Sequence, residues 1–203
     1  MDDKEKILEY AEERFFADGF YKTTMDEVAS NMRMSKKTIY KYFPSKDELL
    51  KNLVNIFTSR VRKEIESIVD GDLHAVEKIV AVTYTMRKIG VKLSDKLMND
   101  IRIHHPSMWK AIEEFRAQMI SKNISKIFAQ GVKEGYIIDV PPVIAINVFL
   151  SSVRAIINPD FIMNNSFSAK EAIEHTFRIL INGLLTDKGR EAYNNLISKK
   201  AQE

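Results

Sequence analysis

Residues 24–50 read TMDEVASNMRMSKKTIYKYFPSKDELL, and this stretch decides the fold. It opens with Thr24 in a Thr-x-x-Glu capping box, which predicts a helix over about residues 25–31. Ser35 is a natural N-cap for a second helix over about residues 36–42, which the following proline prevents from continuing. Two short helices joined by about four residues have the spacing of a helix-turn-helix.

Amphipathic helices are predicted on both sides of this stretch. The preceding helix ends near Gly19, because glycine can take the left-handed conformation of a helix C-terminus. The capping box Ser45-Lys46-Asp47-Glu48 opens a long helix with an apolar stripe, which Asp70-Gly71-Asp72 ends. The apolar faces consist of Ile7, Leu8, Ala11 and Phe15 in the first helix, and of Leu50, Val54, Phe57, Val61, Ile65 and Ile68 in the long one.

The rest of the chain keeps apolar residues at intervals of three and four, with only seven Gly and five Pro to interrupt them. The last two predicted helices are apolar on most of their perimeter, so each needs partners on two faces. We expect an all-α fold, with an N-terminal three-helix domain that contains the helix-turn-helix and a larger helical domain after it. The further helices are predicted near residues 73–88, 91–103, 107–133, 142–157 and 168–186.

The charge of the helix-turn-helix is one-sided. Residues 28–45 contain no acid. A short basic helix with hydroxyl-bearing side chains is suited to lie among phosphates and to reach base edges in the major groove. The whole chain has a net charge of only +3, so the local arrangement indicates duplex DNA as a partner and the overall charge does not. The basic residues are Arg33, Lys36, Lys37 and Lys41, and Lys46 follows them.

The composition argues against several other classes of protein. The chain has 203 residues, 45% of them hydrophobic, which is enough for a sizeable core. It has no cysteine, which excludes disulfides and thiolate metal sites and fits the cytoplasmic localisation that we expect. No secretory signal is evident, and the most apolar stretch, residues 143–150, is far short of the ~20 residues that span a bilayer. Catalytic motifs are absent, so we expect no catalytic residue, cofactor or metal.

Residues 24–29 and 35–50 together resemble the DNA-binding signature of the TetR (tetracycline-repressor) family of transcriptional regulators. The resemblance is strong over roughly residues 5–55 and beyond them extends only to the all-helical plan. It implies that the leading turn of the second short helix contacts bases and backbone, and that Lys46 binds phosphate. Ile39 and Phe43 are expected to lie in the core, and Phe20 and Tyr21 to pack. The expected DNA-binding residues are Thr24, Arg33, Lys36, Lys37, Thr38, Tyr40, Tyr42 and Lys46.

One turn position departs from the family pattern. Family members often have glycine there, but this chain has Arg33. A non-glycine residue in the left-handed conformation costs roughly 1 kcal/mol. Either the turn differs from that conformation, or a phosphate contact of Arg33 offsets the strain.

The resemblance also implies a division of function, with DNA binding in residues 1–46 and ligand binding and dimerisation in residues 47–203. The protein would be a homodimeric repressor on an inverted-repeat operator, released by a small hydrophobic or amphipathic effector. The last two predicted helices would form a four-helix bundle with the partner's through Ala145, Val148, Ile156, Phe177, Leu180 and Leu184. The candidate effector-binding residues are Met86, Met98, Trp109, Phe115, Met119, Asn147, Phe149 and Arg154, of which Asn147 and Arg154 are polar groups that need a partner if buried.

Other interpretations remain open. The same DNA-binding domain could belong to an activator or to a corepressor-dependent regulator, which differ from a ligand-released repressor in the sign of the ligand effect. A helical protein-interaction module with an acidic partner is a further alternative, and a hydrolase is the most remote. The methionines and aromatic residues also fit a simple core. His104 and His105 could suggest a metal site, but adjacent helical residues point about 100° apart and no third ligand is suitably spaced, so capping of a helix end is the preferred role.

Overall fold

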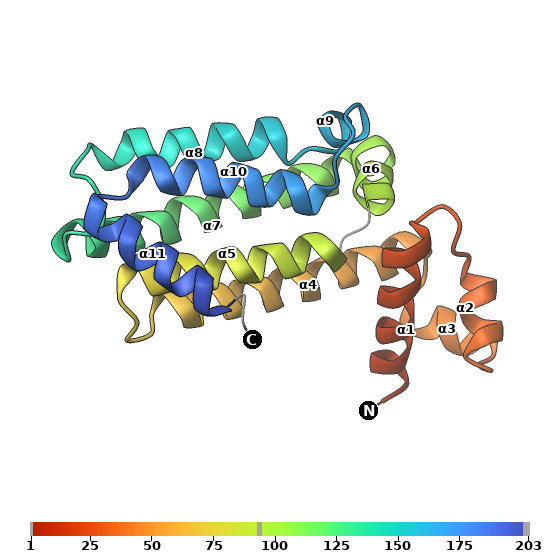
Figure 1. Ribbon diagram of the computed structural model, residues 1–203. Helices are drawn as coiled ribbons and strands as arrows, with labels where there is room; N and C mark the ends of the chain where they lie inside the picture. The colour runs from red at the N-terminus through yellow and green to blue at the C-terminus, as the bar shows by residue number, and fades with distance from the viewer. Residues whose placement is uncertain (1, 93–94, 201–203) are drawn as a thin grey trace. The chain divides into compact units, whose positions relative to one another are not determined.

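The computed structural model describes residues 2–92 and 95–200, most of them in α-helices (Figure 1). They form two compact units, which divide within α4 (Lys46–Val69) and α7 (Pro106–Lys133). The first unit comprises Met1–Val61 and Lys92–Glu113, and the second comprises Arg62–Val91 and Glu114–Glu203. The expected all-α class is confirmed. Among the described residues, no helix combines the length and the apolar character needed to cross a bilayer.

The first unit is built from short helices with well-defined N-caps. Capping boxes begin α1 (Asp3–Asp18) at Asp2 and α2 (Met25–Asn31) at Thr24, and the Ser35 side chain caps α3 (Lys36–Tyr42). The limits of α2 and α3 are those that the sequence predicts. The assignment of DNA binding to residues 1–46, and of ligand binding and dimerisation to residues 47–203, stays a prediction. The unit contains α1 (Asp3–Asp18), α2 (Met25–Asn31), α3 (Lys36–Tyr42), the first part of α4, α6 (Asp95–His104) and the start of α7.

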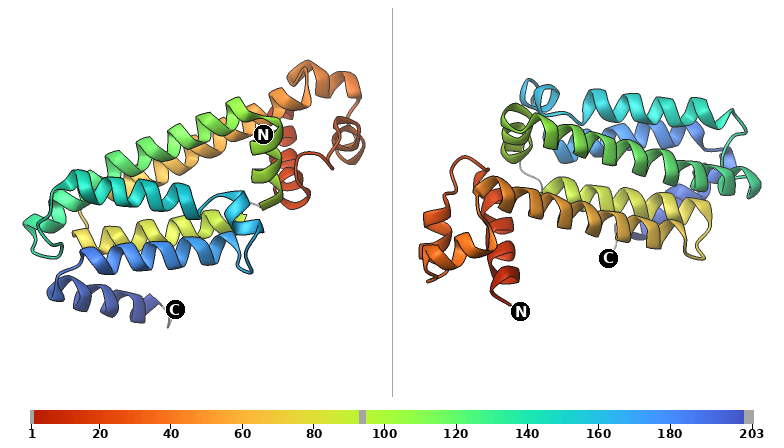
Figure 2. Two further views of the ribbon diagram at one scale, coloured as in Figure 1. Left: turned by 90° about the horizontal axis from the view of Figure 1, so that it is seen from above. Right: turned by 180° about the vertical axis from the view of Figure 1, so that it is seen from behind.

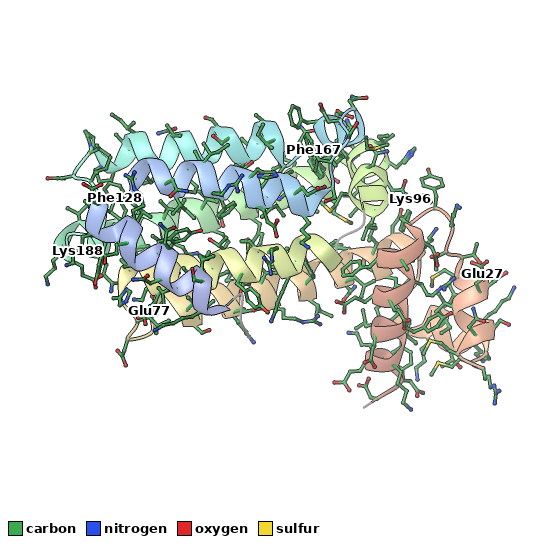
Figure 3. The ribbon with its side chains drawn as sticks, viewed as in Figure 1. Glu27, Glu77, Lys96, Phe128, Phe167 and Lys188 are labelled. Atoms are coloured by element: carbon green, nitrogen blue, oxygen red, sulfur yellow. The ribbon has the colours of Figure 1, made fainter. Side chains whose placement is uncertain are left out.

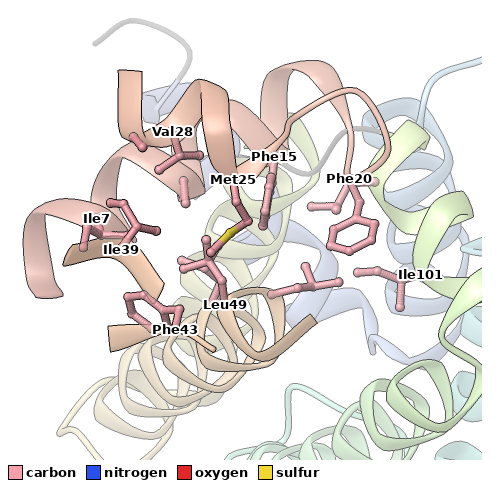
Figure 4. Close-up of a cluster of buried hydrophobic side chains, with 14 of the residues drawn as sticks. Ile7, Phe15, Phe20, Met25, Val28, Ile39, Phe43, Leu49 and Ile101 are labelled. Atoms are coloured by element: carbon pink, nitrogen blue, oxygen red, sulfur yellow. The ribbon is translucent and has the colours of Figure 1, made fainter. Parts of the chain in front are cut away.

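The core of the first unit anchors α3 between its neighbours. Ile39 and Phe43 are fully buried, as predicted. They lie in one cluster with Ile7 of α1 and Leu49 of α4 (Figure 4). Burial of a large apolar side chain is worth about 1.5–3 kcal/mol. These two anchors therefore hold a helix that is too short to be stable alone.

The second unit is a bundle of long helices. In Figure 1 and both views of Figure 2, α5 (Ala75–Lys92) and α8 (Pro142–Ile156) run opposite to α7 and α10 (Ala169–Leu184). Lys122 of α7 pairs with Glu66 of α4 at 2.6 Å. The buried Lys78 of α5 donates to Gln130 Oε1 of α7 at 2.8 Å, which fixes the register of these two helices. The unit also contains α5 (Ala75–Lys92), α8 (Pro142–Ile156), α9 (Pro159–Met163), α10 (Ala169–Leu184) and α11 (Asp187–Lys200).

Two of these helices, α9 and α11, were not predicted. The sequence predicts that the last helix ends at residue 186, but α11 follows it. Just before α11, two backbone hydrogen bonds join residues 184–186 to residues 136–138. They run from Thr186 N to Tyr136 O (3.0 Å) and from Ile138 N to Leu184 O (2.9 Å). Tyr193 of α11 is buried in the core of the unit. The helix thus depends on docking to residues about fifty positions earlier, which local periodicity does not reveal.

Gly189 lies at this docking point. A methyl group on Gly189 would overlap the Tyr136 carbonyl oxygen, a backbone atom that cannot rotate away. We expect Gly189→Ala to lower the free energy of unfolding by about 1–3 kcal/mol, measured by urea unfolding with circular dichroism. Asn195→Ala, at an exposed position of the same helix, is the control, because alanine favours a helix there. Equal stability of the two variants would contradict the close contact at Gly189.

Candidate nucleic-acid interface

The leading turn of α3 presents the expected recognition residues at the surface. Lys36, Lys37 and Tyr40 are exposed. Thr38 is partly buried, and its N–H donates to Ser35 Oγ at 3.1 Å, with the two hydroxyls 2.8 Å apart. Thr38 is thus partly engaged in capping, while the two lysines and the tyrosine face solvent.

The other end of α3 is packed more closely. Tyr42 is half-buried and packs against the core of the unit. The Nζ of Lys41 lies 5.7 Å from the centroid of the Tyr42 ring. This contact leaves the Lys41 side chain at the surface beside the recognition turn.

Lys36 forms an ion pair across the helix-turn-helix. Its Nζ lies 2.6 Å from Oδ2 of Asp26 in α2, and this hydrogen bond raises the pKa of Lys36. Both side chains are mostly exposed, so the pair adds little to stability. Asp26 is therefore positioned to compete with a DNA phosphate for Lys36.

Arg33 adopts the left-handed conformation, with φ of 54°. Backbone hydrogen bonds from Arg33 N to Ser30 O (3.0 Å) and from Met34 N to Ala29 O (2.9 Å) fix the turn around it. The alternative of a different turn is thus excluded, and the roughly 1 kcal/mol of strain is present. The Arg33 side chain is exposed, and its contact with phosphate stays a prediction.

Thr24 caps α2 as predicted. Its Oγ1 accepts the N–H of Glu27 at 3.1 Å, and the Glu27 carboxylate accepts the N–H of Thr24 at 2.7 Å. The hydrogen bonds that the Glu27 carboxylate accepts from the N–H and the hydroxyl of Thr24 lower the pKa of Glu27. Glu27 lies at the exposed start of α2 (Figure 3).

Lys46, at the start of α4, rests on aromatic rings of the loop between α1 and α2. Its Nζ lies 4.1 Å from the centroid of the Phe20 ring and 6.0 Å from that of Tyr21. Partial burial lowers the pKa of Lys46, and nearby carboxylates, chiefly that of Asp100, act in the opposite direction. Phe20 is buried, as predicted, while Tyr21 is 59% exposed. The rings thus hold the Lys46 ammonium on a defined surface.

α6 supports the same loop. Asp100 Oδ2 accepts the N–H groups of Phe20 (3.0 Å) and Tyr21 (3.2 Å). The rings of His105 and His104 pack edge-on against those of Phe20 and Tyr21, with centroids 4.8 and 4.5 Å apart. Ring packing is therefore the observed role of these histidines, and no group of three metal-ligating side chains was found in the part of the chain that the structure describes. Sequence reasoning missed Asp100, because its partners are about eighty residues away.

The candidate effector-binding residues are divided between the two units. Met98 and Trp109 pack against the core of the first unit, whereas the other six belong to the second. Met119 and Phe149 are buried, and Met86 and Phe115 are half-buried. The eight residues are thus distributed over both units, and their role in effector binding stays a prediction.

Asn147 and Arg154, the two polar residues of this set, are not buried within the protomer. Both are exposed on α8. Asn147 Nδ2 donates to the Val143 carbonyl one turn earlier, at 2.8 Å. Neither side chain needs a ligand to compensate for burial.

Asn123 of α7 is a buried polar residue that sequence reasoning missed, with 5% of its surface exposed. Its Nδ2 donates to the Met119 carbonyl at 2.9 Å, but its Oδ1 receives no hydrogen bond from the described residues. Asn123 lies one heptad before Gln130, and Thr85 lies one heptad after Lys78, the partner of Gln130. A polar residue between Met119 and Ile127 on one apolar face was the available signal.

Most of the candidate dimer residues lie in or against the core of the second unit. Ala145 is buried, Ile156 is half-buried, and Phe177, Leu180 and Leu184 are half-buried against the core. The helices α8 and α10 pack on each other. Of the apolar residues that they direct outward, only Val148 is among the candidate dimer residues. The outward residues are Val143 (62% exposed), Ile144 (56%), Val148 (48%) and Ile179 (70%).

Comparisons with known proteins agree with this geometry. Residues 7–53 match the model of the bacterial regulatory proteins of the tetR family. The uncharacterized HTH-type transcriptional regulator YvaF of Bacillus subtilis (strain 168) is 21% identical over 170 residues, which cover 83% of this chain and 89% of that protein. The HTH-type transcriptional regulator HbdR of Aromatoleum sp. (strain CIB) is 26% identical over 196 residues, which cover 93% of this chain and 83% of that protein.

Solved structures share the fold. A TetR-family transcriptional regulator from Marinobacter aquaeolei VT8 has a TM-score of 0.72 and 20% identity, and the match covers 98% of both chains. The SmeT–triclosan complex has a TM-score of 0.65 and 16% identity, and the match covers 91% of this chain and 92% of that one. The match over α1 to α4 coincides with the unit that carries the exposed basic helix. Residues 7–53 therefore carry the helix-turn-helix of the tetR family, and the chain as a whole resembles HTH-type transcriptional regulators.

Proposed function

We propose that this regulator is a repressor that binds an inverted-repeat operator as a homodimer and is released by a small hydrophobic or amphipathic effector. Residues 1–46 supply the DNA-binding surface, and residues 47–203 supply effector binding and dimerisation. The observation that carries the proposal is the exposed basic turn of α3, held rigidly by Ile39 and Phe43. Two such helices related by two-fold symmetry fit successive major grooves, about 34–36 Å apart.

Lys46 is proposed to bind a phosphate, which carries no sequence information. We therefore expect Lys46→Ala to weaken binding to every duplex and to lower the slope of log K against log salt by about one unit. Fluorescence anisotropy would measure this, with an operator selected from a random duplex library and with a scrambled duplex of equal length. Lys63→Ala, an exposed lysine of the second unit, is the control. Equal slopes for Lys46→Ala and the parent protein would remove Lys46 from the phosphate contacts.

The outward apolar face of α8 and α10 is proposed as the dimer interface. Ile144 and Val148 lie one turn apart on α8, and Ile179 is the most exposed large apolar residue of α10. The same face has small exposed residues, Ala155 and Gly183, which allow helices to approach closely. This assignment keeps the predicted four-helix bundle but gives the contacts to different side chains, because most of those predicted face the protomer's own core.

A charge on this face should separate the subunits. We expect Ile179→Glu to raise the dimer dissociation constant by about 100-fold or more, because two buried carboxylates would lack partners. The protomer should stay folded, since Ile179 is 70% exposed. Sedimentation velocity measures the assembly, and the selected operator tests DNA binding, which should weaken as well. Ile197→Glu, on an exposed apolar residue of α11, is the matched control. Dissociation by Ile197→Glu alone would place the interface elsewhere.

The effector is proposed to be an apolar molecule with a hydrogen-bond donor for Asn123. A buried acceptor without a protein donor is costly, and a bound hydroxyl or amine would satisfy it. The nearby Thr85 hydroxyl donates to Glu64 Oε1 at 3.0 Å. The effector releases DNA only if it binds the DNA-incompetent form more tightly than the DNA-bound form.

The buried Oδ1 of Asn123 should therefore lower the free energy of unfolding in the absence of effector. We expect Asn123→Leu to raise the free energy of unfolding by about 1 kcal/mol, measured by urea unfolding. Asn52→Leu is the control, because Asn52 makes the same bond to a carbonyl one turn earlier but is only half-buried. A loss of stability in Asn123→Leu, larger than in the control, would show that the amide oxygen is satisfied by the protein.

A further inference from the structure

Asp100 connects α6 to the loop between α1 and α2 through two hydrogen bonds to a single oxygen. The N–H groups of Phe20 and Tyr21 both point at its Oδ2, at 3.0 and 3.2 Å. Hydrogen bonds to an ionised acceptor are stronger than neutral ones. The loop begins at Gly19, which has a φ of 88°, a conformation that favours glycine. The backbone of the loop is thus held by one carboxylate from a helix outside the helix-turn-helix.

The two residues held in this way are those that contact Lys46. The Phe20 ring lies under the Lys46 ammonium at 4.1 Å. The ring itself is fixed by edge-on contacts with Phe15 (5.5 Å) and His105 (4.8 Å). A chain of direct contacts therefore runs from the Asp100 carboxylate through the loop to the Lys46 side chain.

We propose that Asp100 is a positioning residue for DNA binding, which fixes the Phe20 ring that places the Lys46 ammonium for a phosphate. This inference rests on the proposed phosphate contact of Lys46 and extends the DNA-binding machinery to α6. A long lysine side chain that is already placed loses less conformational entropy when it meets its phosphate. Any displacement of α6 that moves Asp100 would release the ring and weaken DNA binding.

Charge alone makes the opposite prediction. Asp100 is an acid whose charge acts on Lys46, so it also repels a phosphate that approaches the lysine. If charge were its main effect, its removal would tighten DNA binding. If positioning is its main effect, its removal weakens DNA binding although a negative charge has been lost.

The test compares Asp100→Ala with Asp100→Asn on a fluorescein-labelled duplex of mixed sequence, because a phosphate contact does not depend on sequence. We expect Asp100→Ala to weaken binding about fivefold to tenfold, with a salt slope lower by up to one unit. Asp100→Asn restores an acceptor for the loop amides without the charge, and should recover part of the loss. Tighter binding in both variants would overturn the proposal in favour of charge alone.

Asp47→Asn is the charge-matched control, since Asp47 also acts on Lys46 by charge but does not accept the loop amides. It should leave binding unchanged or tighten it. The decisive measurement repeats Asp100→Ala in the Lys46→Ala background. If Asp100 acts through Lys46, the second substitution has no further weakening effect, and the two free-energy changes are not additive. Additive losses would overturn the proposal, because they would mean that Asp100 supports the unit in general.

Phe20→Leu provides a second variant that does not touch the carboxylate. It keeps apolar packing but removes the ring under the ammonium, so it should weaken binding in the parent and leave the Lys46→Ala protein unchanged. Circular dichroism confirms that each variant is folded. If Lys46→Ala itself leaves the salt slope unchanged, the proposed phosphate contact fails. If Lys46→Ala lowers the slope while Asp100→Ala and Phe20→Leu bind like the parent, the positioning role alone fails.

Discussion

The burial of Ile39 and Phe43 is the constraint on which the DNA-binding surface depends. α3 spans Lys36–Tyr42, two turns, and a helix of this length has no appreciable stability in water. Its orientation is set by two side chains that lie in the shared core with α1 and α4. Because the basic residues of α3 occupy the remaining faces, the core also decides which of them point outward.

Two cations of this surface, Lys36 and Lys46, are held in place by acids of the same unit. Lys36 pairs with Asp26. Lys46 lies on the ring of Phe20, whose backbone N–H donates to Asp100. Each acid lowers the attraction of the surface for phosphate in general, which agrees with a net charge of only +3. In return each acid restricts where its cation lies. Such a surface favours DNA that presents phosphates at the right places over DNA that merely supplies negative charge.

The sequence predicted the parts of the molecule that local interactions determine. The spans of α2 and α3, the Thr24 cap and the burial of Ile39 and Phe43 all follow from patterns within a few residues. α11 and Asp100 could not be predicted in this way, because their partners lie about fifty and eighty residues away in sequence. The outward side of α8 and α10 could not be predicted for another reason. The perimeter of these helices is apolar on several sides, so sequence alone does not tell the side that faces the core from the side that faces outward.

Two local costs remain that packing does not explain. Arg33 stands in a conformation that suits glycine, and the Asn123 oxygen is buried without a donor among the described residues. Neither arrangement is required by the fold, since glycine at the first position and leucine at the second would meet the same backbone and volume. Features that reduce stability in this way are expected at functional sites. The two positions lie in different units, one on the basic turn beside α3 and one inside the helical bundle. They therefore fit two separate binding functions, one for phosphate and one for a small molecule.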